Sequence, residues 1–321
     1  MRRRRVLAGL AATLVPAPVL AQGVVKRIAV LMGYREGDPG AADYITALTQ
    51  GLNEHGWKLG ANLEIVWRWA GGKPALFEQY ASELVALKPD ALVAQGTPSV
   101  NALKPKAGSI PIVFTIVTDP VGQGMVASLA QPGGTVTGFT DFDVAMAGKW
   151  MELLSHVMPK VTRVAVLFNP ETAPFAELMV HAIEQAAPAV GLTPVASPCR
   201  NDAALEAALE AADGAVALPD LFNLVHRRAI VKAAARLRRP VIYFNRTFTV
   251  AGGLMSYGVD YAQQFKHAAD YLDRLLKGAR AADLPVQQPA EFDLTVNLKT
   301  AKALGIELPQ TMIAVADEVI E

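Results

Sequence analysis

One structural unit starts twice in this chain. Residues 24–43, VVKRIAVLMGYREGDPGAAD, and residues 161–178, VTRVAVLFNPETAPFAEL, each run from a short aliphatic segment through a turn-rich loop into an amphipathic stretch. Near-continuous aliphatic strands that alternate with helices are typical of a parallel sheet covered by helices on both faces. Two such starts in 321 residues predict two α/β domains of similar order.

The alternation continues after each start. Further aliphatic segments lie at residues 61–69, 89–96 and 110–117 in the first half, and at residues 192–198, 213–220 and 239–245 in the second. Amphipathic stretches separate these segments, as a doubly wound sheet requires. The sequence therefore predicts the α/β fold class, with two doubly wound, Rossmann-like lobes.

The last part of the chain predicts how the lobes are joined. Residues 251–260 are typical of a strand, and residues 292–309 of a strand followed by a helix. Between them, residues 261–278 predict a helix with an apolar face formed by Phe265, Ala269, Leu272, Leu275 and Leu276. This stretch is too short to form a third domain, so it has to complete the other two.

We therefore expect the chain to cross between the lobes near residues 138, 246 and 287, through several short connections that form a hinge. The expected first lobe is residues 22–138 plus 246–286. The expected second lobe is residues 139–245 plus 287–321.

The first 21 residues are typical of an export signal. MRRRR is a basic start, residues 6–20 are apolar but too short and proline-interrupted to span a bilayer, and Val19 and Ala21 are small residues before Gln22. We expect cleavage after Ala21 and a periplasmic protein. The arginine run resembles a twin-arginine signal loosely, so the general secretory and twin-arginine routes stay open. No cysteine follows the expected cut, so a lipid anchor is not expected there.

Composition argues against several classes of function. The 30 basic and 30 acidic residues balance, and no basic stripe follows the first five residues, so no nucleic-acid partner is expected. The lone cysteine, Cys199, cannot form a disulfide within the chain and has no histidine beside it. The chain lacks the phosphate-loop, dinucleotide-binding, zinc-protease and nucleophile-elbow motifs, and its five histidines have no metal-ligand spacing. We expect no cofactor, no metal and no enzyme activity.

The position of a ligand site follows from the fold. Open parallel sheets bind ligands beyond the carboxyl ends of their strands, so two similar lobes predict a site in the cleft between those ends. Thr97, Asp119, Thr172 and Asp220 each follow an expected strand near a helix start. Such side chains either cap the helix or face the cleft. Both interpretations stay open for each of them.

The chain resembles the ABC-transporter substrate-binding proteins of the type I periplasmic binding-protein fold, in the family that includes tryptophan-binding lipoproteins. The matching stretches include GTPSV, IPIVFTIVTDPVGQGMVASLAQPGGTVTGFT, RVAVLFNPET, AGGLMSYGVD and NLKTAKALGIELP, in this order from about Lys26 to Glu321. The resemblance implies a monomeric two-lobed receptor that closes on a small molecule and delivers it to a membrane permease.

The resemblance also implies a set of cleft residues. From the first lobe it implies Tyr34, Thr97, Pro98, Thr118 and Asp119, from the second Asn169, Thr172 and Asp220, and from the last part of the chain Tyr257 and Asp260. If the ligand is an amino acid or a related small organic acid, Asp220 or Asp119 would pair with an ammonium group. Helix starts after Thr97 and Thr172 would then hold a carboxylate, and Tyr34 and Tyr257 would supply apolar faces.

Other interpretations remain at this stage. If Asp119 and Asp220 are both ordinary helix caps, the ligand is neutral. A periplasmic sensor subunit with a signalling partner would have the same sequence features, and an exported α/β enzyme would use the same cleft. A sugar-responsive transcription regulator of this fold would carry a helix-turn-helix in place of the export signal.

Overall fold

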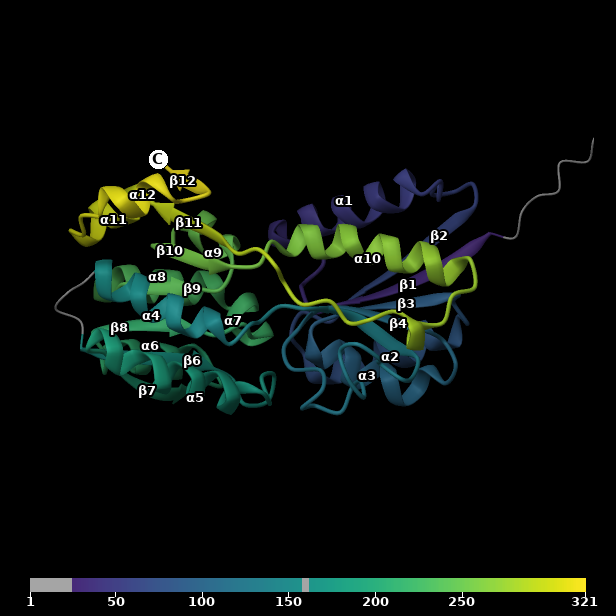
Figure 1. Ribbon diagram of the computed structural model, residues 1–321, viewed down its shortest axis with the longest axis horizontal. Coiled ribbons are helices and arrows are strands. Elements are labelled where there is room, and N and C mark those ends of the chain that lie inside the picture. Colours follow the sequence, from purple (N-terminus) through teal and green to yellow (C-terminus); the bar gives the residue numbers. More distant parts are fainter. Residues whose placement is uncertain (1–24, 158–161) are drawn as a thin grey trace, which may run out of the picture.

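The computed structural model of the protein describes residues 25–157 and 162–321. The expected export signal lies outside the described residues. Two lobes lie side by side along the long axis of the molecule (Figure 1), each with its own sheet. No helix in the described part of the chain is both long and apolar enough to cross a membrane.

The first lobe is built on a parallel sheet. Within the described residues this sheet has five strands in the order β2-β1-β3-β4-β5. The strands are β1 (Lys26–Met32), β2 (Leu63–Trp69), β3 (Ala91–Gln95), β4 (Ile112–Val117) and β5 (Val136–Thr140). The helices are α1 (Pro39–Glu54), α2 (Pro74–Ala86), α3 (Thr97–Ala107) and α10 (Tyr261–Leu276). Helices α1 and α10 pack together on one face of the sheet, and α2 and α3 lie on the other (Figure 1).

The second lobe carries a larger, mixed sheet. Its order in the described residues is β12-β11-β10-β9-β8-β6-β7, and β11 runs antiparallel to β10 while the other pairs are parallel. The strands are β6 (Arg163–Phe168), β7 (Thr193–Pro198), β8 (Gly214–Ala217), β9 (Val241–Tyr243), β10 (Met255–Gly258), β11 (Asp293–Asn297) and β12 (Glu318–Ile320). The antiparallel strand is the one that returns last from the first lobe.

Helices cover this second sheet as well. They are α4 (Ala145–Val157), α5 (Ala176–Ala186), α6 (Asp202–Glu210), α7 (Leu221–Val225), α8 (Arg227–Leu237), α9 (Arg246–Val250), α11 (Leu298–Leu304) and α12 (Gln310–Ala314). Short 3₁₀ turns, η1 (Ala187–Val190) and η2 (Ala281–Asp283), join other segments. Helix α4 packs against α5, and α6 packs against α8. The α/β class with two doubly wound lobes is thus confirmed.

The buried faces follow the sequence pattern. Residues 28–32 of β1 and all residues of β3 and β4 are buried, as expected for strands covered on both faces. The apolar face expected on α10 is also buried, from Phe265 to Leu276. Gly51 of α1 lets that helix lie close to α10, because a Cβ atom at this position would lie 2.7 Å from the Cβ of Ala269.

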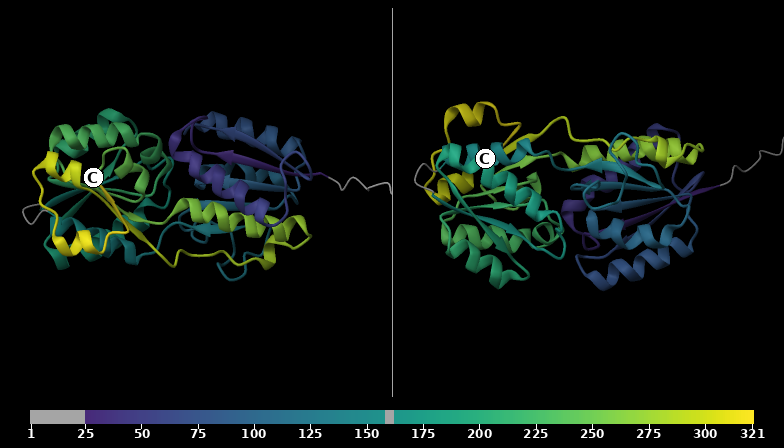
Figure 2. Two further views of the ribbon diagram at one scale, coloured as in Figure 1. Left: turned by 90° about the horizontal axis from the view of Figure 1, so that it is seen from above. Right: turned by 60° about the horizontal axis from the view of Figure 1, so that its bottom comes forward.

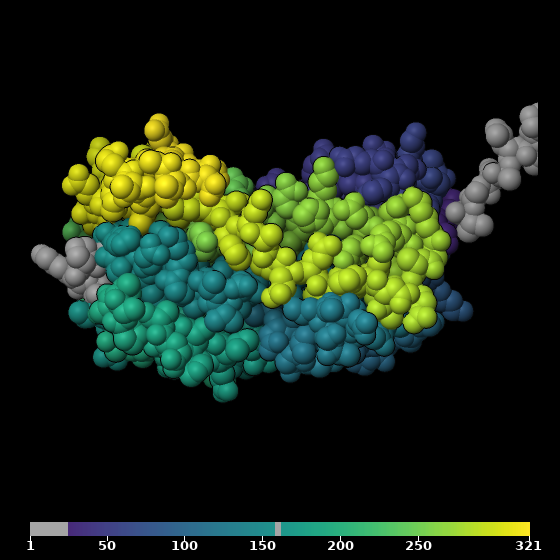
Figure 3. Space-filling view, in the orientation of Figure 1, coloured from purple at the N-terminus to yellow at the C-terminus, as the bar shows by residue number. Residues whose placement is uncertain are grey.

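The crossings between the lobes differ in one place from the sequence expectation. The chain crosses from β5 to α4, from β10 to α10, and from η2 to β11 (Figure 2). We expected the second crossing near residue 246, but α9 contacts β9, β10 and β11, and β10 pairs with strands of the second sheet. The crossing therefore comes after Gly258. The last crossing runs over the junction of the lobes, where the two surfaces meet (Figure 3).

Candidate functional site

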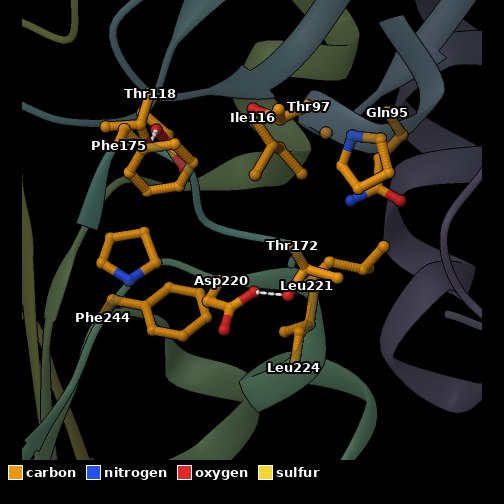
Figure 4. A pocket seen from close by; sticks show the side chains of 14 residues that line it. Gln95, Thr97, Ile116, Thr118, Thr172, Phe175, Asp220, Leu221, Leu224 and Phe244 are labelled. Atoms are coloured by element: carbon orange, nitrogen blue, oxygen red, sulfur yellow. Dashed lines mark hydrogen bonds between the residues drawn. The ribbon is translucent and has the colours of Figure 1, made fainter. Parts of the chain in front are cut away.

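A small, narrow cavity lies between the lobes at the carboxyl ends of both sheets. Its polar lining residues are Gln95, Thr97, Thr118, Asp141, Thr172 and Asp220. Its main apolar lining residues are Pro98, Ile116, Phe175, Leu221, Leu224 and Phe244 (Figure 4). The carboxyl-end position agrees with the rule for open parallel sheets.

The structure brings five of the expected residues together around this cavity. Thr97, Pro98 and Thr118 line it from the first lobe, and Thr172 and Asp220 line it from the second. Each of these residues comes shortly after a strand of its lobe. The strand ends of the two sheets therefore place these residues on opposite walls of the cavity. The sequence logic of strand ends therefore found residues of both walls.

The other five expected residues lie outside the cavity lining. Asp119 turns back to accept a hydrogen bond from the Gly122 N–H (2.8 Å), and Asp260 caps α10 by accepting from the Ala262 N–H (2.8 Å). The ring of Tyr257 packs against Phe292, with 5.7 Å between ring centroids.

Tyr34 and Asn169 have supporting positions. Tyr34 is fully buried, and its hydroxyl lies 3.4 Å from that of Tyr44. Asn169 lies under the cavity wall, where its N–H donates to Asp220 and its side-chain oxygen accepts from the Glu171 N–H. Both residues therefore form their hydrogen bonds outside the cavity lining.

Several lining residues were missed by the sequence analysis. Gln95 is the last residue of β3 and Asp141 follows β5, and both are at most 2% exposed. Phe175 and Phe244 come from loops of the second lobe. Leu221 lies one residue after Asp220 and packs against Gly33 of the first lobe, since a Cβ on Gly33 would lie 2.6 Å from Leu221 Cδ1. Asp141 also follows a strand, but the segment VTGFT before it has no aliphatic run that would mark this strand in the sequence.

Asp220 is held firmly by its own lobe. Its Oδ1 accepts from the Thr172 hydroxyl (2.5 Å, Figure 4) and the Phe222 N–H (3.0 Å), and its Oδ2 accepts from the Asn169 N–H (2.7 Å). Burial raises the pKa of this carboxyl to about 6, against the effect of these donors. The Thr172 hydroxyl is thus committed to Asp220. We expected free N–H groups after Thr172, but the N–H groups of Thr172 and Ala173 both donate to the Asn169 carbonyl (3.1 and 2.8 Å).

Asp141 lies on the first crossing between the lobes. Its Oδ1 accepts from the Thr118 hydroxyl (2.6 Å), and its Oδ2 accepts from the Tyr261 hydroxyl (3.2 Å). Burial raises the pKa of this carboxyl to about 6 as well. The cavity lining thus holds two buried carboxyl groups and, among the described residues that line it, no arginine, lysine or histidine.

The backbone is strained where it lines the first-lobe wall. Ile116 has φ of 58°, in the left-handed region that β-branched residues rarely adopt, at a point where the pairing of β4 with β5 shifts register. The side chain of Gln264 from α10 accepts a hydrogen bond from the Ile116 N–H (2.9 Å). Strain of this kind tends to be stored at functional sites.

An ion pair closes the rim between the lobes. The two terminal guanidinium nitrogens of Arg227 on α8 donate to the carboxylate of Asp38, which caps α1, at 2.5 and 3.2 Å. The two side chains are 7% and 15% exposed. The guanidinium also lies 6.0 Å from the centre of the Tyr34 ring. These contacts and the Leu221–Gly33 packing join the lobes in this structure.

Two observations concern metal and thiol groups in the described residues. No cluster of three or more potential metal ligands occurs among the described residues. Cys199 is buried, and desolvation, with a contribution from the charge of Asp220, raises the pKa of its thiol to about 11. A thiol with such a pKa is a poor nucleophile near neutral pH.

The family model for "ABC transporter substrate binding protein" matches residues 35–320. Together with the two-lobed fold and the cavity between strand ends, this match shows the family. The chain belongs to the substrate-binding proteins of ABC transporters.

Similar proteins include amino-acid binders. A curated relative, the "Tyrosine-binding protein" of Clostridioides difficile, is 28% identical over 80% of this chain and 74% of its own length. A solved structure from Streptococcus pneumonia in complex with L-Trp is 24% identical, with a TM-score of 0.85 over 92% of this chain and 99% of the other. The ligand-free, open structure of a substrate-binding protein with adhesive properties from Clostridium difficile is 26% identical, with a TM-score of 0.67 over the same shares.

Proposed function

We propose that this chain is the periplasmic solute-binding component of an ABC importer, and that its lobes close on one small amino acid or a related ammonium-bearing molecule. The observation that carries this proposal is the cavity between the lobes, which has two buried carboxyl groups and no cationic side chain in its described lining. Buried charges need a partner of opposite sign, and a cationic group on a ligand would supply it.

The first-lobe wall offers a complementary feature for a carboxylate. Helix α3 starts at the cavity with Gly96, Thr97 and Pro98, and no side chain caps its first turn. Pro98 has no N–H, and the Ser99 and Val100 N–H groups donate to the Gly96 carbonyl (3.1 and 3.3 Å), so this start attracts negative charge through the helix dipole rather than through a row of free N–H groups. The two carboxyl groups together with this helix start would suit a zwitterionic amino acid, the ligand class of the two relatives named above.

Closure supplies the mechanism of transport. The ligand-free, open relative superposes less well on this structure than the L-Trp complex does, which favours a closed arrangement of the lobes here. A ligand that touches both lobes binds the closed form better than the open form and shifts the population toward it. We take residues 25–140 with 261–286 and residues 145–258 with 293–321 as the two moving lobes, and the closed monomer as the form that a permease in the inner membrane recognises.

A thermal-shift screen of residues 22–321 tests this function. The panel holds the twenty L-amino acids, aromatic amines and acids, nucleosides and small sugars. A ligand at 100 times its dissociation constant adds about 2.7 kcal/mol to the free energy of unfolding, which raises the melting temperature by a few degrees. We expect hits among the amino acids or amines. Hits restricted to sugars or nucleosides would overturn the ligand class, and a panel without any hit would count against the receptor itself.

A further inference from the structure

We propose that Asp141, rather than Asp220, receives the cationic group of the ligand and transmits its presence to the hinge. This inference rests on the proposed function, because it assigns a residue and a role within the same cavity. Three observations lead to it: the hydrogen bonds that join the crossings, the position of Asp141 among them, and the free acceptor capacity of the two carboxyl groups.

The last crossing and helix α10 are both bonded to the end of β5, where the first crossing begins. Gln287, on the last crossing, accepts from the Thr140 N–H (2.9 Å) and donates its own N–H to the Gly138 carbonyl (2.9 Å). Gln264 of α10 donates to the Thr140 carbonyl (2.8 Å) while it accepts from Ile116. The first crossing is therefore anchored, at the end where it leaves β5, to the last crossing and to α10.

Asp141 is the next residue along this segment. Its bond from Tyr261 links the first crossing to the second, because Tyr261 is the first residue of α10. Its bond from Thr118 links it to the end of β4. Among the described residues of the crossings, Asp141 is the one that also lines the cavity. A ligand that contacts Asp141 thus contacts the hinge directly.

The two carboxyl groups differ in their remaining capacity. An ionised carboxylate has about four acceptor sites. Asp220 already accepts three hydrogen bonds from its own lobe, two of them from backbone N–H groups. Asp141 accepts two, one at each oxygen, and both come from hydroxyl groups that can rotate. Asp141 therefore has more room for the N–H donors of an ammonium group, while Asp220 is committed to its loop.

Charge-neutral variants and three related probes test this assignment. The probes are L-tyrosine, tyramine, which lacks the carboxylate, and 3-(4-hydroxyphenyl)propanoate, which lacks the ammonium group. We expect Asp141→Asn to lower the affinity for L-tyrosine and tyramine about 10- to 100-fold in calorimetric titrations, the usual effect of a lost charge-assisted hydrogen bond. The same variant should bind the propanoate as tightly as the wild type does, or more tightly. If Asp141 had a purely structural role, the variant would bind all three probes more weakly by the same factor.

Matched variants separate the roles. Asp143→Asn removes a carboxylate from the same crossing, where Asp143 caps its own turn through the Ala145 N–H, and should stay within about twofold of wild type. Tyr261→Phe removes the link to α10 and keeps the carboxylate, so we expect a loss of about 2- to 10-fold. Asp220→Asn should lower the melting temperature more than Asp141→Asn does, and it should lower the affinity for L-tyrosine less. Circular dichroism checks that each variant is folded.

Several results would overturn the inference. Equal losses for tyramine and the propanoate in Asp141→Asn would assign Asp141 a structural role, and a larger loss in Asp220→Asn would return the ammonium group to Asp220. If the tightest ligand of the full panel has no cationic group, the inference is wrong although the receptor function stands. If no ligand of the panel binds, the proposed function fails and the inference falls with it.

Discussion

At the scale of the residue, two buried carboxyl groups set the chemistry of the cavity. Asp141 and Asp220 lie at corresponding places, each after a strand of its lobe, yet one was missed by the sequence analysis and the other was found. Asp220 follows an aliphatic strand that the pattern predicts. Asp141 follows β5, VTGFT, whose threonines and glycine do not form an aliphatic run. Asp119 was expected instead, but its φ of 47° turns it into its own loop.

The raised pKa values of these groups predict the pH dependence of stability. Both carboxyls titrate at about 6 in the folded chain and near 3.8 ordinarily, so the folded chain binds more protons than the unfolded chain between about pH 4 and 6. The free energy of unfolding of the ligand-free protein should therefore fall as pH rises through this window, by up to about 3 kcal/mol per group.

Thermal melting without ligand at pH 5.5 and 7.5 checks this expectation. The wild type should melt at the higher temperature at pH 5.5. In the double variant Asp141→Asn with Asp220→Asn, the difference between the two pH values should largely disappear. A wild type that melts higher at pH 7.5 would show that these carboxyls are already ionised in the empty cavity.

At the scale of the element, the sheets were predictable and the connections were less so. Aliphatic runs gave β1, β3, β4 and the strands after residue 161, because buried parallel strands need them. Strand β5 was not predicted, because its pairing depends on Gly138, where a Cβ atom would lie 2.1 Å from the Phe114 carbonyl oxygen. The sequence analysis put the second crossing too early in the chain. Helix α9 and strand β10 stay beside β9 in the second lobe, and the sequence pattern of these elements is the same as that of a chain returning to the first lobe.

The ion pair between α1 and α8 predicts an effect on closure. Asp38→Asn keeps the cap of α1, since asparagine caps well, but removes the charge that pairs with Arg227 across the lobes. Because this pair exists when the lobes are together, we expect ligand affinity to fall about 3- to 30-fold, on the order of 1–2 kcal/mol, with little change in the melting temperature of the ligand-free protein.

Glu36→Gln is the matched control for this prediction, because it removes an exposed carboxylate from the same loop. Its affinity should equal that of the wild type. If Asp38→Asn binds ligand as tightly as Glu36→Gln, the ion pair contributes nothing to closure.

At the scale of the whole molecule, the account depends on two lobes that move about one bonded hinge. The cavity is enclosed by contacts from both lobes, among them Arg227 with Asp38 and Leu221 with Gly33. The proposed closure requires a more open form through which a ligand enters. The ligand-free protein should therefore populate a more extended state than the structure described here.

Small-angle X-ray scattering of residues 22–321, titrated with the strongest ligand of the thermal-shift panel, measures this most directly. We predict that the radius of gyration decreases with ligand and saturates at one ligand per chain, at a value that matches the structure described here. A radius of gyration that stays constant while calorimetry shows the ligand binding would contradict closure of the two lobes on a ligand.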